Sequence, residues 1–286
     1  MIIIHVHLQY VFQKTNIILK IKLYLISMNI ALLFETFLLH WHLVVLFFLV
    51  AILYASVGFG GGSSYLAILA LTGIAYIQIR STALMCNIIV VSGNVFFFNR
   101  QQLYNWKKVI PLVLFSVPFA FIGGYLKISQ TFFFILLGIT LLFAAVTMWV
   151  SKNIIASEDN AKELSSVKNA GYGGVIGFVS GMVGIGGGIF LAPLLHLTNW
   201  DRSKKIAATA SFFILVNSIA GLFGQYSSPS FSVDWSLTSI LLFTVFIGGP
   251  IGSRLGKTFF TPIRLKKATA VLIAFVSLRI LWKYLF

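Results

Sequence analysis

The sequence predicts an all-α polytopic membrane protein with two inverted-topology repeats of about five helical segments each, including glycine-broken half-helices. Three observations predict this class. Of 286 residues, 59% are hydrophobic and 9% are charged, against about 25% charged in an ordinary soluble domain. The apolar residues form successive long runs, and the motif G-x-G-G-G interrupts two of these runs at corresponding places. So few polar residues could not cover the surface of a soluble core of this size.

Residues 1–27 are predicted to be a doubtful N-terminal extension. They are apolar but have Lys14, Lys20 and Lys22 spaced through them, and they lack the uninterrupted core and small-residue cleavage site of a signal peptide. Met28 then leads directly into the first clear membrane segment, which favours Met28 as the true start. The alternative for these residues is an interfacial amphipathic helix.

The apolar runs after Met28 form two sets of five, separated by short polar stretches. The longest polar stretch, 151–169, lies between the sets and contains three of the six acidic residues. We therefore expect a first transmembrane repeat over 28–150, a cytoplasmic linker over 151–169 and a second transmembrane repeat over 170–286. The ten expected segments are 36–57, 63–78, 82–98, 109–126, 131–150, 170–183, 189–198, 206–223, 235–254 and 264–284.

The two halves are predicted to be repeats of one unit. Residues 54–64 read YASVGFGGGSS and residues 180–190 read SGMVGIGGGIF. The glycines of the first copy are each matched in the second, and Thr82-Ala83 likewise corresponds to Thr209-Ala210. Internal similarity at a fixed spacing indicates duplication.

Basic residues in the loops indicate that the second repeat is inverted. Arg100, Lys107 and Lys108 follow the third segment, whereas the equivalent loop of the second half, 225–234, has no Lys or Arg. After the fourth segment the bias is reversed, since the first half has Lys127 alone and the second has a basic cluster at 254–267. Counted with alternating sides, one face receives most of the positive charge, while Arg80, Lys127 and Lys283 fall on the other. The positive-inside rule makes the rich face cytoplasmic and places both ends of the chain outside.

The glycine motifs predict breaks in two membrane helices. Each glycine costs about 1 kcal/mol relative to alanine within a helix, and irregular backbone at membrane depth has to be covered by protein or line a cavity. The apolar run after the second motif is short, so we expect half-helices that begin inside the membrane. The N-terminus of such a helix presents free N–H groups and about half a positive charge, which favours an anion. The alternative is that the glycines only let helices pack closely.

The arrangement of these motifs resembles the sulfite exporter TauE/SafE family. The resemblance rests on G-x-G-G-G followed by a short apolar run with Ala192-Pro193-Leu194, then on the segment A-A-T-A-S at 207–211, in a chain of two halves. It covers nearly all of the chain from Met28 on, although the first copy has no proline where the second has Pro193. It implies a multi-pass carrier of the bacterial inner membrane for small sulfur-containing or organic anions, such as sulfite or a sulfonate.

Polar residues within the apolar runs are further candidates for the substrate path, although each could equally bond a neighbouring helix. Arg80 could attract an anion or extend to the lipid headgroups. The candidate substrate-binding residues are Gly58, Gly60, Gly61, Gly62, Ser63, Ser64, Gly184, Gly186, Gly187, Gly188, Thr82, Asn87, Thr209, Ser211 and Asn217.

Other classes of function are disfavoured. The net charge of +15 comes from basic residues scattered at the ends of apolar runs, so nucleic acid is not expected as a partner. The residues 256–258 resemble the end of a phosphate loop, but Ile251 stands where its first glycine is required. We expect no enzyme activity, no cofactor and no metal, and the partners are the lipid bilayer and a small anionic substrate. A channel-like uniporter, or a structural membrane protein without transport activity, remains the alternative.

Overall fold

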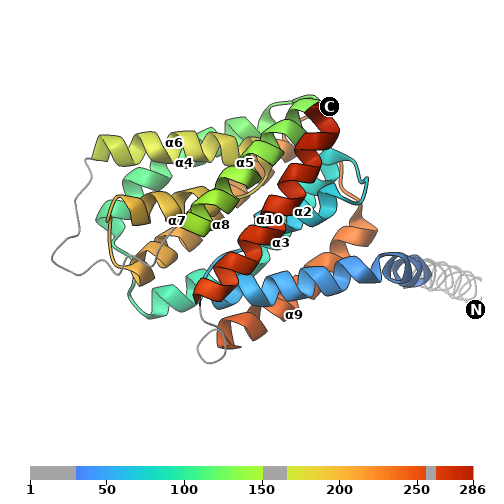
Figure 1. The fold of residues 1–286 in the computed structure, drawn as a ribbon, viewed down its shortest axis with the longest axis horizontal. Helices are drawn as coiled ribbons and strands as arrows, with labels where there is room; N and C mark the ends of the chain where they lie inside the picture. The colour runs from blue at the N-terminus through green and yellow to red at the C-terminus, as the bar shows by residue number, and fades with distance from the viewer. Residues whose placement is uncertain (1–29, 151–165, 256–261, 286) are drawn as a thin grey trace, which may run out of the picture.

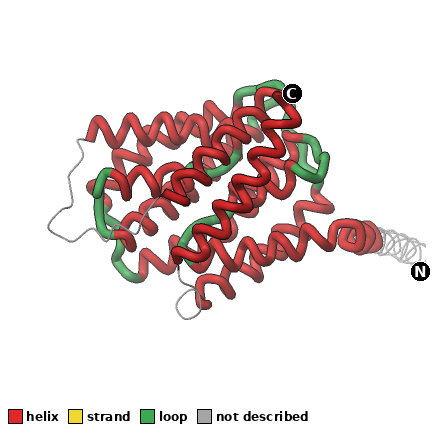
Figure 2. The backbone as a smooth tube through the Cα atoms, in the orientation of Figure 1, coloured by secondary structure: helices red, strands yellow, loops and turns green. Residues whose placement is uncertain are grey.

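The computed structural model describes residues 30–150, 166–255 and 262–285, and their regular structure is helical (Figure 2). The predicted extension over 1–27 and most of the predicted linker lie outside the described residues. A first helix spans Ile30–Ser56. The helices that follow, labelled in Figure 1, are α2 (Gly62–Ala70), α3 (Tyr76–Arg100), α4 (Trp106–Tyr125), α5 (Gln130–Val150), α6 (Ser166–Val183), α7 (Gly188–Leu197), α8 (Ser203–Tyr226), α9 (Trp235–Leu255) and α10 (Pro262–Leu285).

Each predicted segment corresponds to one of these helices, but the boundary between the second and third was wrong. The second segment was expected to continue to residue 78, whereas α2 ends at Ala70 and the chain turns at Gly73, whose φ is +78°. Helix α3 then begins at Tyr76, well before the expected residue 82. The polar residues Gln78, Arg80 and Ser81 suggested a loop, yet they form the first turns of a helix. Arg80 is therefore not a loop residue, and the face with few positive charges loses one of its three.

Six of the described helices are long and apolar enough to cross a membrane: Ile30–Ser56, Tyr76–Arg100, Trp106–Tyr125, Gln130–Trp149, Ser203–Tyr226 and Trp235–Leu255. The two helices that follow the glycine motifs are much shorter, with 9 residues in α2 and 10 in α7. At 1.5 Å per residue they extend about 14–15 Å, half the thickness of the hydrocarbon layer. They have the length expected of half-helices, in a multi-pass membrane protein.

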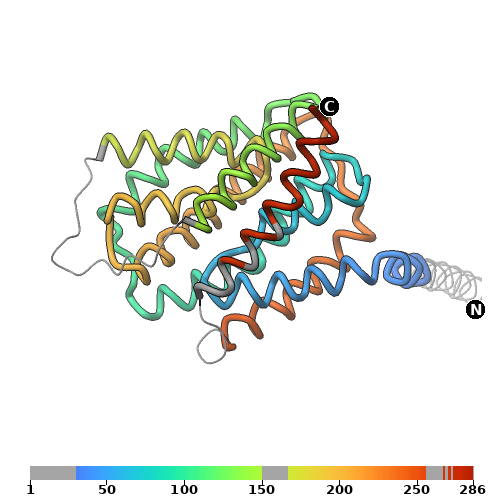
Figure 3. The backbone as a smooth tube through the Cα atoms, in the orientation of Figure 1, coloured from blue at the N-terminus to red at the C-terminus, as the bar shows by residue number. Residues whose placement is uncertain are grey.

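Helix contacts in one half have counterparts in the other. Helix α3 packs on α9, and its counterpart α8 packs on α4; α2 lies against α3 as α7 lies against α8. Helices α3 and α8 contact each other, as do α5 and α10, which cross the front of the molecule in Figures 1 and 3. The pair α4 and α6 lies along one edge of the molecule, and the first helix and α9 lie along the opposite edge. This exchange of partners is consistent with the predicted inverted repeat.

Glycines bring α6 and α4 to backbone contact. Gly173, Gly177 and Gly181 form one stripe along α6, and they face the backbones of Leu112, Ser116 and Ala120 of α4. A Cβ atom at Gly177 would lie 2.5 Å from the Ser116 carbonyl oxygen, too close for any side chain. This is the small-xxx-small packing of membrane helices. Such packing was the alternative for G-x-G-G-G itself, whereas this stripe begins upstream of the second motif.

Candidate functional site

The first glycine of each motif ends the preceding helix. Gly58 and Gly184 have φ of +87° and +88°, the left-handed conformation that closes many helices. The N–H of Phe59 donates to the Tyr54 carbonyl, and the N–H of Ile185 donates to the Ser180 carbonyl, each across five residues. This is the Schellman arrangement, in which a left-handed glycine turns the chain so that free carbonyls at the helix end are bonded. The two copies of the motif thus form the same local structure.

The fourth residue of each G-x-G-G-G motif caps the N-terminus of the short helix that follows. Gly61 and Gly187 are the N-cap residues of α2 and α7, again with left-handed φ of +86° and +82°. Their carbonyls accept the N–H groups of Tyr65 and Leu191 at 3.0 and 3.1 Å. The N–H of Phe190 also donates to the Gly187 carbonyl, at 3.1 Å. The first N–H groups of each helix have no carbonyl within the helix to bond. Each motif therefore presents a helix N-terminus inside the protein.

The two motifs meet at the side chain of Asn87 on α3. Its Oδ1 accepts the N–H of Gly62 at 3.2 Å, and its Nδ2 donates to the Ile185 carbonyl at 3.1 Å and to Ser218 Oγ at 2.9 Å. Asn87 is fully buried. One carboxamide therefore joins the start of α2 to the second glycine loop and to α8, across a large separation in sequence.

Close packing around Asn87 explains why further positions of the motifs are glycine. A Cβ atom at Gly60 or Gly186 would overlap the Asn87 carboxamide, and one at Gly62 would lie 2.6 Å from the Ile185 carbonyl oxygen. The third and fifth positions of each motif thus need glycine because a side chain would have no space. The first and fourth positions need glycine because their φ is positive. These contacts bring the predicted glycines of both repeats into one buried place.

The serines after the first motif are bonded within the protein. The Tyr54 hydroxyl lies 3.3 Å from Ser63 Oγ and 2.8 Å from Ser64 Oγ, and all three side chains are buried. Ser211 Oγ of α8 lies within hydrogen-bond distance of both the Gly58 carbonyl and the Ala207 carbonyl, and its contact with Gly58 attaches the first loop to the second repeat. Ser63 and Ser64 in the first turn of α2, and Ser211 on α8, therefore lie beside the first glycine loop.

Asn217 lies apart from this meeting point. Its Nδ2 donates to Ser116 Oγ of α4 at 3.0 Å and to the Phe213 carbonyl at 2.8 Å. Its Oδ1 is buried and has no hydrogen-bond partner. Asn217 therefore joins α8 to α4, and its Oδ1 is an acceptor that no described residue uses.

Thr82 and Thr209 occupy equivalent positions in α3 and α8 but differ in their bonding. Thr82 Oγ1 lies 2.8 Å from Thr238 Oγ1 of α9, whereas Thr209 Oγ1 is buried without a hydrogen-bond partner. A buried hydroxyl normally has a partner, because leaving it unbonded costs about 1–3 kcal/mol. The hydroxyl of Thr209 therefore has no partner among the described residues and is available to a group from outside them.

The threonine pair gives a first prediction. Thr82→Val should lower the free energy of unfolding by about 1–3 kcal/mol, because Thr238 loses its buried partner. Thr209→Val should leave that free energy unchanged or raise it, since no bond within the protein is lost. Thermal unfolding of the purified protein in detergent measures both. A larger loss in Thr209→Val than in Thr82→Val would contradict the bonding described here.

Arg80 is the functional candidate whose setting the sequence analysis missed. It is 4% exposed, and its Nη2 donates to the carbonyls of Gly181 and Gly124. It neither extends to the membrane surface nor lies in a loop, which were the settings expected for it. The sequence held one signal for this setting: Arg80 stands between Ile79 and Ser81, directly before the mainly apolar run over 82–98.

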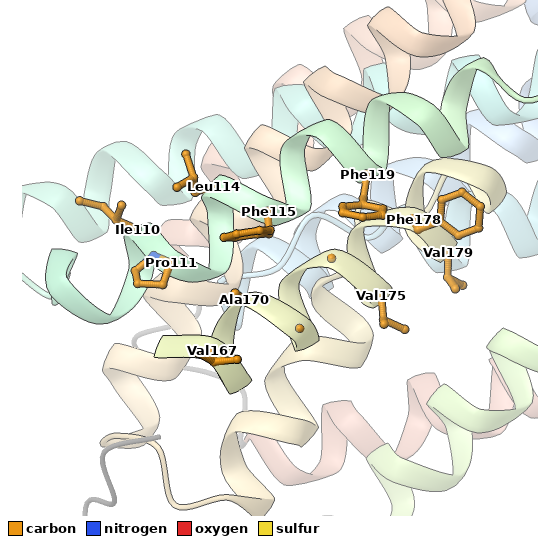
Figure 4. Close-up of a pocket in the computed structure, with 12 residues that line it drawn as sticks. Ile110, Pro111, Leu114, Phe115, Phe119, Val167, Ala170, Val175, Phe178 and Val179 are labelled. Atoms are coloured by element: carbon orange, nitrogen blue, oxygen red, sulfur yellow. The ribbon is translucent and has the colours of Figure 1, made fainter. Parts of the chain in front are cut away.

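A groove of about 870 Å³ runs between α4 and α6 (Figure 4). Its lining is wholly apolar and includes Ile110, Leu114, Phe115, Phe119, Val167 and Val175. Figure 4 shows these side chains on the two facing helices, with no polar group among them. An anion would lose its hydration there without any replacement, so the groove is not an anion site.

Comparisons with known proteins agree with the family resemblance. The family model for "Sulfite exporter TauE/SafE" matches residues 43–280. A "Probable membrane transporter protein" of Sinorhizobium fredii is 32% identical over 250 residues, which are 84% of this chain and 97% of that protein. Another, of Methanocaldococcus jannaschii, is 28% identical over 204 residues, 68% of this chain and 75% of that protein. No solved structure matches the chain at a significant level.

Proposed function

The chain belongs to the sulfite exporter TauE/SafE family of membrane transporters, and from this premise we propose that it is a secondary carrier of a small anion such as sulfite or a sulfonate. The proposed binding site is the place where the two glycine loops meet. A single observation carries the proposal: the N-terminus of α2 and the glycine loop that leads into α7, which come from opposite halves of the chain, are both bonded to Asn87.

The chemistry of that place suits an anion. Each helix N-terminus contributes N–H donors and about half a positive charge, so two of them approach the charge of one cation without any ionised side chain. Asn87 already occupies part of this place, with its Oδ1 bonded to the N–H of Gly62 at 3.2 Å. The oxygen of an anion would take over this role of the neutral carboxamide oxygen when it binds.

Burial of the loops supports a carrier that alternates between two open states. Residues from Gly60 to Leu69 are buried, so a substrate reaches the loops only after helices move apart. The proposed division into repeats over 28–150 and 170–286 supplies two equivalent units for this movement. If the units are inverted, an exchange of their conformations opens the site first to one side of the membrane and then to the other.

The charged residues favour transport driven by the gradient of the anion itself. Among the described acidic residues, Glu35 and Asp234 are exposed, and the Asp201 carboxylate lies 3.9 Å from Lys108 Nζ. None of these three lies at the glycine loops to carry a proton together with the anion. Uniport is therefore the second candidate, and it differs from proton-coupled transport in having no response to an imposed pH gradient.

Flux measurements on glycine variants test the proposal. Gly61→Ala and Gly187→Ala should each reduce anion flux into proteoliposomes at least tenfold, because a Cβ atom there strains the left-handed N-cap and moves the helix start. At Gly187 this atom would also lie 2.8 Å from the Phe213 ring. The anions to compare are sulfite, thiosulfate, sulfate, sulfoacetate and taurine, with and without a pH gradient.

Gly73→Ala is the matched control. Gly73 has the same left-handed backbone, with φ of +78°, but a Cβ atom there would have no neighbour within 4 Å. It carries the conformational cost of about 1–2 kcal/mol without touching the loops, and its flux should stay near that of the wild type. Wild-type protein that moves none of these anions faster than empty liposomes, or loop variants that keep their flux, would contradict the proposal.

A further inference from the structure

Arg80 is a buried cation that no described carboxylate neutralises. Its side chain belongs to α3, and 4% of the residue is exposed. The one ion pair found within the described residues joins Lys108 to Asp201, while Glu35 and Asp234 are exposed. A charge buried in this way normally has a partner of opposite sign.

The guanidinium is held by the ends of two helices. Arg80 Nη2 donates to the Gly181 carbonyl at 3.2 Å and more weakly to the Gly124 carbonyl at 3.5 Å. Both carbonyls belong to the last turn of their helices, α6 and α4, where the peptide dipoles give a partial negative charge. The Phe133 ring lies 6.0 Å from the guanidinium carbon. The Nε–H is buried and has no acceptor among the described residues.

A second donor without an acceptor belongs to the same neighbourhood. Ser81 Oγ lies 2.9 Å from Gln225 Oε1 and 3.1 Å from the Ile77 carbonyl oxygen, so the carboxamide of Gln225 lies beside the first turns of α3. Gln225 is 4% exposed, and its Nε2 is buried with no partner. One turn earlier on α8, Gly221 packs against Gly124, whose carbonyl accepts from Arg80. Two buried donors thus lack acceptors where α3, α4 and α8 meet.

This neighbourhood adjoins the proposed carrier site. A Cβ atom at Gly184, the first glycine of the second motif, would lie 3.3 Å from the Arg80 carbonyl oxygen. Asn87 follows Arg80 by two helical turns and therefore lies on the same face of α3, about 10 Å along its axis. An anion moving along this face toward Asn87 from the start of α3 would pass Arg80.

We propose that Arg80 and Gln225 form a binding point for an oxyanion on the path to the glycine loops. One oxygen of the anion accepts from Arg80 Nε and another from Gln225 Nε2. The inference rests on the proposed carrier function and narrows its substrate class to anions with at least two oxygens, such as sulfite, sulfonates or carboxylates. The two donors belong to different side chains, so an anion with two oxygens can accept from both, and the bond from the charged guanidinium is the stronger of the two.

Gln225→Glu is the most informative variant, since it would supply the missing negative charge from within the protein. The variant carboxylate should pair with Arg80, raise the unfolding temperature in detergent, and weaken stabilisation by sodium sulfite at least tenfold. Sodium chloride at equal ionic strength should stabilise neither protein. Gln101→Glu introduces the same charge at the exposed end of α3 and should leave the sulfite response unchanged.

Arg80→Gln provides an independent variant, with Arg100→Gln at the exposed end of the same helix as its control. Arg80→Gln should raise the half-saturating sulfite concentration at least tenfold, both for thermal stabilisation and for flux, and Arg100→Gln should not. If sulfite stabilises the wild type and is carried by it, while Gln225→Glu and Arg80→Gln keep the wild-type half-saturation, the proposal about Arg80 fails and the carrier function stands. If the wild type neither binds nor carries sulfite, both proposals fail together.

Discussion

Asn87→Asp is expected to reduce sulfite flux at least about a hundredfold in protein that still inserts into the membrane. The carboxylate keeps the acceptor for the N–H of Gly62 but loses the donor that bonds the Ile185 carbonyl and Ser218. It also places a fixed negative charge between the N-terminus of α2 and the glycine loop that leads into α7. Two unit charges 4 Å apart repel by about 4 kcal/mol at an effective dielectric constant of 20, which corresponds to roughly a thousandfold in binding. Sulfite-driven counterflow in proteoliposomes measures the loss.

Asn87→Ala separates charge repulsion from loss of the bridge. It removes the same hydrogen bonds without adding a charge, so its flux should exceed that of Asn87→Asp by at least tenfold. Asn94→Asp is a separate variant that also buries a carboxylate on this face of α3. Asn94 donates to the Phe59 carbonyl of the first glycine loop at 3.2 Å. Equal loss of flux in Asn87→Ala and Asn87→Asp would mean that the bridge matters and that no anion binds there.

Gly177→Ala is expected to lower the free energy of unfolding by about 1–3 kcal/mol, the usual cost of an extra methyl group in a packed interior. The added Cβ would lie 2.5 Å from the Ser116 carbonyl oxygen and 2.8 Å from its Cα. These are backbone atoms of α4, so α6 has to move away along the whole glycine stripe. The unfolding temperature of the purified protein in detergent should therefore fall by several degrees.

Gly171→Ala is the control on the same helix. A Cβ atom at Gly171 would have no neighbour within 4 Å, so alanine should stabilise α6 by up to about 1 kcal/mol through its better helix propensity. If both variants unfolded at the same temperature, close packing of α6 on α4 would not contribute to stability. The contrast also distinguishes glycines that pack helices from those that break them, because Gly177 lies before the second motif.

The glycine motifs were interpretable from the sequence because their effect is local. Four glycines in five residues cannot continue a helix against lipid, whatever surrounds them, and both motifs do end one helix and begin a short one. The inward setting of Arg80 was not predictable in this way. A polar residue near the end of an apolar run has the same sequence pattern whether it lies in a loop or inside the first turns of a helix, and the expected boundary at residue 82 was wrong for that reason.

The sequence by itself determined the membrane class, the helical segments and the repetition of the glycine motif, because hydropathy and backbone strain act over a few neighbouring residues. Only the tertiary structure decided which polar groups meet. Asn87 binds both glycine loops, Thr82 has a partner while Thr209 has none, and Arg80 lies against the ends of α4 and α6. These are contacts between residues far apart in the chain, and they depend on the approach of helices that glycines such as Gly177 permit. A single sequence records the composition of each helix, but the partner of a buried polar group is set by the packing of several helices at once.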